Sequence, residues 1–174
     1  MPQDYNETIN LPKTDFPMRA GLPKREPELL KTFYDKSVYE TLMALNAGKP
    51  AFILHDGPPF SNGDIHIGTA MNKIIKDIIL RHKNMSGWFA PYTPGWDNHG
   101  MPIESAIIKN NKLDRKKMSI PQFRDACCEF AEHYVDRQRE QFKRLGVIGD
   151  WDNPYLTMVP AFEAEEVRVF GKMY

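Results

Sequence analysis

The feature that most constrains the fold is a short apolar run, followed by a loop rich in glycine and proline and then by a helical pattern. Residues 51–54 are all apolar and are bounded by turn residues, which is typical of a buried strand. Residues 56–64 contain two glycines and two prolines, so they predict a loop. A helical pattern begins at His66, and residues 89–92 indicate a second strand. This order predicts the opening of a parallel α/β sheet, because the connection is long enough for a right-handed crossover.

The helix predicted after His66 has one apolar stripe. The stripe consists of Ala70, Met71, Ile74, Ile75, Ile78 and Ile79. Four charged residues lie off it, namely Lys73, Lys76, Asp77 and Arg81. Apolar residues at this spacing are typical of a helix with one apolar face, and the helix is expected to end near Gly87.

The flanking segments complete the predicted organisation. Residues 1–25 contain four prolines and predict an extended arm, and residues 26–46 predict a helix that Gly48 and Pro50 end. The chain therefore divides into an N-terminal arm and helix, 1–48, and an α/β unit, 49–174. Within the unit, further helices are predicted after Pro102, from Pro121 and from residue 161, with a basic surface loop at 110–120 and a loop-rich stretch at 146–157. The helix from Pro121 has an apolar face that contains Phe123, Cys127, Phe130, Tyr134, Phe142 and Leu145.

Composition limits the class of protein. Apolar residues make up 41% of the 174-residue chain, enough for the core of one domain. The 23 basic and 23 acidic residues cancel, so the overall charge gives no electrostatic footprint for nucleic acid. Cys127 and Cys128 are adjacent, which favours a reduced, cytoplasmic protein. Residues 1–21 do not resemble a signal peptide, no run is apolar enough to span a membrane, and no histidine spacing indicates a metal site.

The loop and the helix that follows it have the pattern of a nucleotide site. The carboxyl end of a first strand, where it leads into a helix N-terminus, is where α/β proteins bind nucleotides, and free N–H groups there favour anions. Gly57, Gly63 and Gly68 would let the backbone approach a ligand, and His66 adds a hydrogen-bond donor. On these residues alone, a plain strand-to-helix turn with a surface histidine explains the pattern equally well. Asp97, in Gly-Trp-Asp-Asn, is likewise compatible with simple capping of a turn.

The order of residues goes further than composition does. Residues 56–63 and 66–69 resemble the first signature of class I aminoacyl-tRNA synthetases, and within that class they resemble the isoleucyl, valyl and leucyl group. The resemblance continues through residues 72–73, 76–77, 81, 91–104, 144–146 and 150–151. The arm at 11–19 is similar to that of bacterial isoleucine enzymes, which implies isoleucine rather than valine as substrate.

The resemblance implies roles for individual residues. His66 would bind the ATP phosphates and act in catalysis, and Gly68 would lie beneath the adenine. Gly57 and Pro58 would line the pocket for the amino acid side chain. Asp97 would pair with the substrate α-ammonium through a charge-assisted hydrogen bond that orients the carboxylate for attack.

Three further segments need separate comment. Asn62 is a weaker candidate for ATP binding, since it only lies near the loop. The family signature ordinarily ends in a second histidine, where this chain has Thr69. The Thr69 hydroxyl can donate to a phosphate in ATP binding and catalysis but cannot carry charge. Residues 116–120, Lys-Lys-Met-Ser-Ile, superficially resemble the second family signature but are interpreted as an exposed basic loop.

The resemblance as a whole predicts both fold and chemistry. Residues 49–174 would be the first half of a Rossmann-like parallel-sheet catalytic domain, incomplete because a helical pattern runs to Tyr174 without a cap. The parent would activate isoleucine with ATP and Mg²⁺ and transfer it to tRNA(Ile), while this piece alone would lack full activity. Zinc is compatible with a longer parent but has no site here. The alternatives are a valyl- or leucyl-type synthetase, a nucleotidyltransferase of the same superfamily, and an inert binding or folding fragment.

Overall fold

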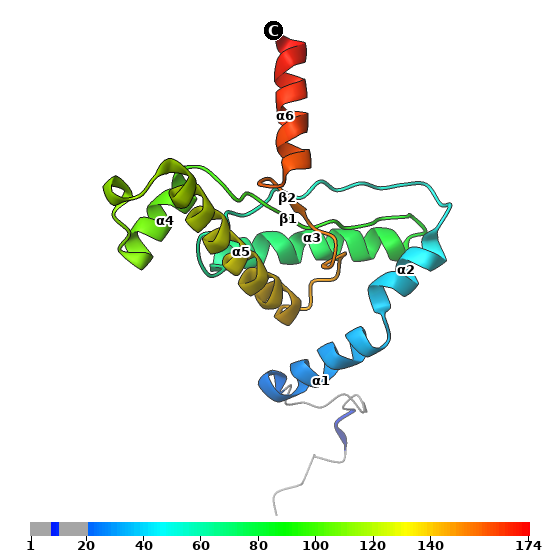
Figure 1. Cartoon of the computed structure of the whole chain (residues 1–174). Helices are drawn as coiled ribbons and strands as arrows, with labels where there is room; N and C mark the ends of the chain where they lie inside the picture. Colours follow the sequence, from blue (N-terminus) through cyan, green and yellow to red (C-terminus); the bar gives the residue numbers. More distant parts are fainter. Residues whose placement is uncertain (1–7, 11–20) are drawn as a thin grey trace, which may run out of the picture.

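The computed structural model describes residues 8–10 and 21–174, and helices make up most of it (Figure 1). The elements in chain order are α1 (Leu22–Asp35), α2 (Val38–Asn46), α3 (Ile67–Met85), β1 (Gly95–Trp96), α4 (Met101–Asn111), the 3-10 helix η2 (Arg115–Lys117), α5 (Ile120–Arg144), β2 (Tyr155–Leu156) and α6 (Pro160–Met173). Within the described part of the chain, no helix has both the length and the apolar character that a membrane span requires.

Two helices precede the loop where the sequence predicts one. α1 begins at Leu22 with Pro23 in its first turn, so residues 22–25 are helical and the extended arm predicted there is wrong. The helix breaks at Ser37, whose backbone is left-handed with φ 45° and therefore cannot continue an α-helix. The rest of the predicted arm, residues 1–7 and 11–20, lies outside the described residues.

The two predicted strands, 51–54 and 89–92, are reduced to a single parallel bridge between Ala51 and Phe89. The Phe52 N–H donates to the Phe89 carbonyl at 2.9 Å, and the Phe89 N–H donates to Pro50 at the same distance. Ile53 is 69% exposed, so the predicted burial of this run is wrong. In the described residues no second strand pairs with 51–54, and a run without neighbours on both sides stays open to solvent.

The parallel pairing lies instead in segments predicted as loops. β1 and β2 pair in parallel, with Gly95 opposite Tyr155 and Trp96 opposite Leu156. A two-residue strand is too short for a periodic pattern, which explains why the sequence does not predict it. The predicted parallel arrangement is therefore present as a small sheet in a mainly helical chain.

Helix α3 buries two polar residues together with Ala70 and Leu80, and it leaves most of its predicted apolar stripe exposed. Lys73 and Asn84 are buried, whereas Met71 is 58% exposed and Ile78 is 60% exposed. An apolar stripe ordinarily faces a core, so this orientation is the reverse of the usual one. It is possible because Lys73 and Asn84 both find hydrogen-bond partners inside the molecule.

The core consists of two clusters that α5 joins. Its capping box of Ser119 and Gln122 begins the helix one residue before Pro121, close to the predicted start. One cluster joins α4 to the first half of α5 and contains Ile103, Ile107, Phe123, Phe130 and Ala131. The other joins α3, β1 and the second half of α5 and contains Leu80, Ala90, Tyr92, Trp96, Val135, Phe142, Val147 and Trp151. Helix α6 extends away from both clusters and buries none of its residues (Figure 1).

Candidate functional site

The loop at 56–63 and the segment at 95–98 lie side by side. Asp97 is bridged in parallel to Phe60. Its N–H donates to the Pro59 carbonyl at 2.9 Å, and its carbonyl accepts from the Ser61 N–H at 3.1 Å. The structure thus brings the predicted contact Asp97 beside the predicted loop, although about forty residues separate them in the sequence.

His66 is the N-cap of α3. Its Nδ1 accepts from the N–H of Gly68 at 3.1 Å and from the N–H of Thr69 at 3.3 Å. An accepting Nδ1 leaves the ring proton on Nε2, so the exposed edge of the ring is a donor. Two of the amides expected to bind an anion are therefore already bonded, and an anion at this helix end would meet Nε2–H first.

Gly68 lies close to the ring of His66. A Cβ at this position would lie 3.0 Å from Cε1 and 3.1 Å from Nδ1 of His66. A side chain at position 68 would therefore require the ring of His66 to shift by a few tenths of an ångström. This local reason for glycine stands beside the predicted contact with adenine.

The remaining predicted contacts differ in exposure and in their partners. Asp97 is half-buried, and among the described residues its carboxylate has no hydrogen-bond or ion-pair partner. Among the described residues no N–H donates to the Asp97 carboxylate. The alternative interpretation, in which Asp97 caps a turn, therefore does not apply. Pro58, Asn62 and Thr69 are half-buried, and Gly57 is exposed at the start of the loop.

Asp56, which sequence reasoning did not select, is the centre of the frame that holds these segments. Its carboxylate is fully buried and pairs with the ammonium of Lys73 and, at 2.8 Å, with that of Lys76. The Gly95 N–H donates to the same carboxylate at 3.1 Å. The Tyr155 hydroxyl donates to the Asp56 carbonyl at 2.6 Å. One residue thus connects the loop with α3, β1 and β2.

Burial and charge act in opposite directions on this cluster. Burial alone would raise the pKa of the Asp56 carboxyl, but the ammonium groups of Lys73 and Lys76 hold it below its usual range. Burial lowers the pKa of Lys73 to about 8, although Asp56 opposes the shift. Burial, reinforced by Asp56, also raises the pKa of Tyr92, whose hydroxyl accepts from Lys73 at 2.9 Å. At neutral pH the cluster is therefore a hydrogen-bonded ion pair beside a neutral tyrosine.

Gln138 of α5 is a second connecting residue that sequence reasoning missed. Its side chain is buried, and its Nε2 donates to the carbonyls of Phe60 at 3.0 Å and Gly63 at 2.7 Å. Its Oε1 accepts from the Trp96 indole at 2.9 Å. The loop and β1 are thereby fixed to α5. A glutamine in an amphipathic helix carries no sequence signal for such a role, whereas Asp56 directly precedes the Gly-Pro-Pro motif.

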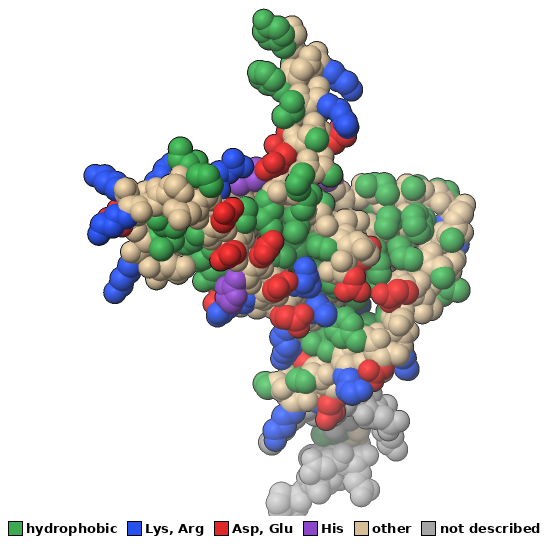
Figure 2. Space-filling model, in the orientation of Figure 1, with side chains coloured by type: hydrophobic (Ala, Val, Ile, Leu, Met, Phe, Trp, Pro, Cys, Tyr) green, Lys and Arg blue, Asp and Glu red, His purple; other side chains and the backbone are tan. Residues whose placement is uncertain are grey.

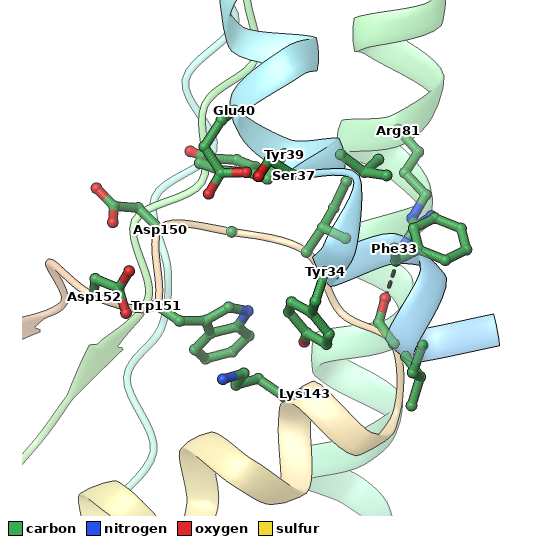
Figure 3. Close-up of a pocket in the computed structure, with 15 residues that line it drawn as sticks. Phe33, Tyr34, Ser37, Tyr39, Glu40, Arg81, Lys143, Asp150, Trp151 and Asp152 are labelled. Carbon is green, nitrogen blue, oxygen red and sulfur yellow. Dashed lines mark hydrogen bonds between the residues drawn. The ribbon is translucent and has the colours of Figure 1, made fainter. Parts of the chain in front are cut away.

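Two of the cavities lie away from Asp56 and the loop that it holds. One of about 340 Å³ lies between α1, α2 and residues 146–152 (Figure 3). Figure 3 shows the carboxylates of Asp150 and Asp152 on one side of it, Arg81 on the opposite side and Lys143 below. None of the predicted contact residues lines this cavity.

The second cavity, of about 440 Å³, begins at the residues that follow Asp97 and runs between α4 and α5. Asn98 lines it and is buried, and its Oδ1 has no hydrogen-bond partner. Within the described residues no cluster of three or more His, Cys, Asp or Glu side chains could hold a metal ion.

Comparison with known proteins identifies the family. The profile of the family described as "tRNA synthetases class I (I, L, M and V)" matches residues 28–174. The chain belongs to this family.

Relatives within the family are closely similar. The isoleucine–tRNA ligase of Geobacillus kaustophilus (strain HTA426) is 57% identical over 170 residues, and that of Bacillus subtilis (strain 168) is 55% identical over 170 residues. Each match covers 98% of this chain and 18% of the relative, so the chain spans about 18% of the length of these curated relatives.

A solved structure shares the fold. It is the ternary complex of the Agrobacterium radiobacter K84 agnB2 LeuRS with tRNA and LeuAMS, and it matches with a TM-score of 0.68 at 19% sequence identity. The match covers 90% of this chain and 18% of that one. At this identity the likeness concerns the fold alone.

Proposed function

We propose that this chain is part of an isoleucine–tRNA ligase, which activates isoleucine with ATP to isoleucyl-adenylate and transfers it to tRNA(Ile). The observation that carries the proposal is the 57% identity, over 98% of the chain, to a relative of that name. The solved relative is a complex with tRNA, which supports RNA as a partner. On its own, without the remaining length of such relatives, the chain would lack full activity.

The geometry supports separate contacts for these residues in the activation step. The His66 Nε2–H would donate to the ATP phosphates, and the Thr69 hydroxyl and Asn62 would add neutral donors at the same helix end. The unpartnered carboxylate of Asp97 would accept from the substrate α-ammonium, a charge-assisted bond that orients the substrate carboxylate towards the α-phosphate. Gly57 and Pro58 would border the amino acid side chain, and Gly68 would lie beneath the adenine.

The magnesium ion and the wider fold belong to the proposal as well. Because the described residues form no metal cluster, Mg²⁺ would be carried mainly by the ATP phosphates, where it neutralises charge. The small parallel sheet would be the first part of a Rossmann-like catalytic domain over 49–174, with 1–48 as an N-terminal arm and helix. A cytoplasmic location accompanies the proposal.

Calorimetry with non-hydrolysable aminoacyl-adenylate analogues tests the amino acid and ATP contacts together. The isoleucyl analogue should bind more tightly than the valyl and leucyl analogues. The three differ only in the amino acid side chain, which is the part that the proposed pocket borders. Asp97→Asn should weaken all three, since it removes the charge that faces the α-ammonium. A preference for the leucyl or valyl analogue would refute isoleucine as the substrate.

Pyrophosphate exchange separates a wrong substrate from an incomplete site. The matching residues of the Bacillus subtilis relative would be replaced by this chain, and ATP–pyrophosphate exchange measured with isoleucine. Exchange that Asp97→Asn abolishes is the expected result. Exchange by the 174-residue chain alone would contradict the prediction that it is incomplete, and a folded but inactive chimera would argue against the proposed chemistry.

A further inference from the structure

Positive charge is concentrated at one end of the molecule, although the chain as a whole is neutral. Residues 109–117 contain five of the 23 Lys and Arg residues and only one of the 23 Asp and Glu residues. The five, here called the cationic tip, are Lys109, Lys112, Arg115, Lys116 and Lys117, and all are exposed. Lys and Arg side chains gather in Figure 2 at the end of the molecule where α4 leads into α5. The overall charge balance therefore conceals a local cationic surface.

Three lysines of the cationic tip have no acidic partner among the described residues. Arg115 pairs with Glu104 at 3.3 Å and lies 5.1 Å from the centre of the Phe123 ring. Lys117 pairs weakly with Asp114, at 3.6 Å. The ammonium groups of Lys109, Lys112 and Lys116 remain available to an external anion.

The backbone of the cationic tip is held by a helix cap and by packing against the core. The Asp114 side chain caps η2 by accepting the Lys116 N–H at 3.0 Å. Leu113 and Met118, on either side of η2, pack against the core cluster of α4 and α5. Because the backbone is already held, binding to an anionic surface would cost only side-chain ordering.

The backbone conformation at Lys112 is not one that favours lysine. Lys112 ends α4 in the left-handed conformation, φ 52°, where glycine or asparagine is the ordinary residue. A cation near a helix C-terminus does complement the dipole, which offers a plain structural reason for Lys109 and Lys112. That reason does not reach Lys116, which lies beyond the last turn of α4.

We propose that the cationic tip binds the phosphate backbone of RNA. Flexible point charges spread over a short surface suit phosphates without reading bases, as in contacts that position a nucleic acid. The inference rests on the proposed function in one respect, namely that RNA is then the polyanion the protein must hold. The proposal also differs from what the neutral composition indicates, because the positive charge that would bind nucleic acid is confined to residues 109–117.

Fluorescence anisotropy of the 174-residue chain with a labelled RNA hairpin of about 12 base pairs, over a series of salt concentrations, tests the proposal. The triple variant Lys109→Gln, Lys112→Asn, Lys116→Gln removes the three unpaired charges, and asparagine suits the left-handed backbone at 112. We expect the slope of log K against log salt to fall by about two to three and affinity at about 0.1 M salt to fall at least tenfold.

The matched control is Lys24→Gln, Lys36→Gln, Lys172→Gln, which removes three exposed charges from α1, its C-cap and α6. It should retain RNA affinity within about threefold, since overall charge acts only weakly through salt. Circular dichroism checks that both triple variants are folded. No RNA binding by the unchanged chain at about 50 mM salt, equal loss in both triples, or tighter binding to phosphatidylserine vesicles than to RNA would each overturn the proposal.

The ligase proposal and the RNA-binding proposal can be refuted independently of each other. The tip variant should bind the isoleucyl-adenylate analogue as the unchanged chain does, because the cationic tip contains none of the proposed contact residues. Loss of RNA binding with analogue binding intact supports the tip alone. Failure of the amino acid assays with RNA binding intact refutes the proposed ligase and leaves an RNA-binding surface.

Discussion

A single carboxylate, that of Asp56, joins three segments of the candidate site, and its neighbours are unequal. The side chain of Lys73 is 2% exposed, whereas that of Lys76 is 14% exposed. Removing one partner of a buried ion pair is costly because the remaining charge stays buried without compensation. The consequence of each substitution therefore depends on which charge is left behind.

Asp56→Asn should destabilise the chain more than Lys73→Met. The first leaves two ammonium groups facing a neutral amide, and a loss of about 3–5 kcal/mol is expected. After the second, Asp56 still has Lys76 and the Gly95 N–H, so the loss should be smaller. Urea unfolding followed by circular dichroism measures both. A larger loss in Lys73→Met would show that Asp56 is not the centre of the cluster.

The lowered pKa of Asp56 gives a pH dependence with a definite sign. A carboxyl whose folded pKa lies below its unfolded value stabilises the fold above the unfolded pKa, and loses that contribution as the pH falls through the folded one. The difference in unfolding free energy between the unchanged chain and Asp56→Asn should therefore be constant above about pH 5 and shrink below about pH 4. Urea titrations across that range measure it. A difference independent of pH would contradict the assignment.

At the scale of elements, the first turn of α3 combines two roles in His66, capping and a free Nε2–H. The two can be separated, because asparagine is a preferred N-cap but places no donor where Nε2 lies. The structure thus offers a variant that keeps the helix and removes the proposed phosphate contact.

His66→Asn should keep thermal stability near that of the unchanged chain, whereas His66→Ala should lose about 1 kcal/mol with the cap. Both should weaken binding of the adenylate analogue, since both remove the Nε2 donor. Differential scanning calorimetry and titration calorimetry give the two quantities. If His66→Asn bound the analogue unchanged, the proposed phosphate contact would be wrong.

Gly95→Ala tests the close packing of β1 on β2. A Cβ at position 95 would lie 1.9–2.4 Å from atoms of the Tyr155 ring, so the ring must move and its hydrogen bond to Asp56 is lost. A destabilisation of about 1–3 kcal/mol or more is expected from overpacking. The double variant Gly95→Ala, Tyr155→Ala should lose less than the sum of the single variants in urea unfolding. Additive losses would show that the two residues do not collide.

The helices followed from local signals, and the strands did not. Pro121 and the apolar spacing that follows it are both local signals, so α5 was predicted closely. Ala51–Leu54 has the composition of a buried strand, but burial depends on neighbours that the run itself does not encode. For the same reason, the inward face of α3 could not be predicted, because Lys73 is stabilised by Asp56, seventeen positions earlier.

The candidate site divides in the same way. The loop, the helix N-terminus and Asp97 were selected from residue order, and the structure brings Asp97 beside the loop. The residues that hold them, Asp56 and Gln138, act through contacts between distant segments and have no local pattern. Residues that would contact a ligand can be predicted from residue order more readily than residues that position them.

At the scale of the whole molecule, α1 and α2 attach to the rest mainly through polar contacts, among them the buried bond from Asn46 Nδ2 to Asn84 Oδ1 at 3.1 Å. The Tyr39 hydroxyl accepts from the Tyr92 N–H at 3.1 Å and donates to the Tyr92 carbonyl at 3.3 Å. Lys143 lies 5.1 Å from the centre of the Tyr34 ring, and Arg144 pairs with Glu26 at 2.9 Å. Neither helix buries an apolar side chain fully.

Tyr39→Phe should loosen this attachment without unfolding the core. We expect amide hydrogens of residues 22–46 to exchange about fivefold faster, corresponding to about 1 kcal/mol for a lost hydrogen bond, while those of α5 keep their rates. Hydrogen exchange read by mass spectrometry resolves the two regions. Equal acceleration in both would mean that α1 and α2 unfold together with the core.

The bond from Tyr155 to Asp56 spans 99 positions of sequence. A chain that leaves the ribosome from its N-terminus presents the loop and α3 long before Tyr155 emerges, and the contact cannot close earlier. The connection of the loop and α3 to β2 is therefore made late in synthesis. Until then the nascent chain carries a capped helix and an unfinished site.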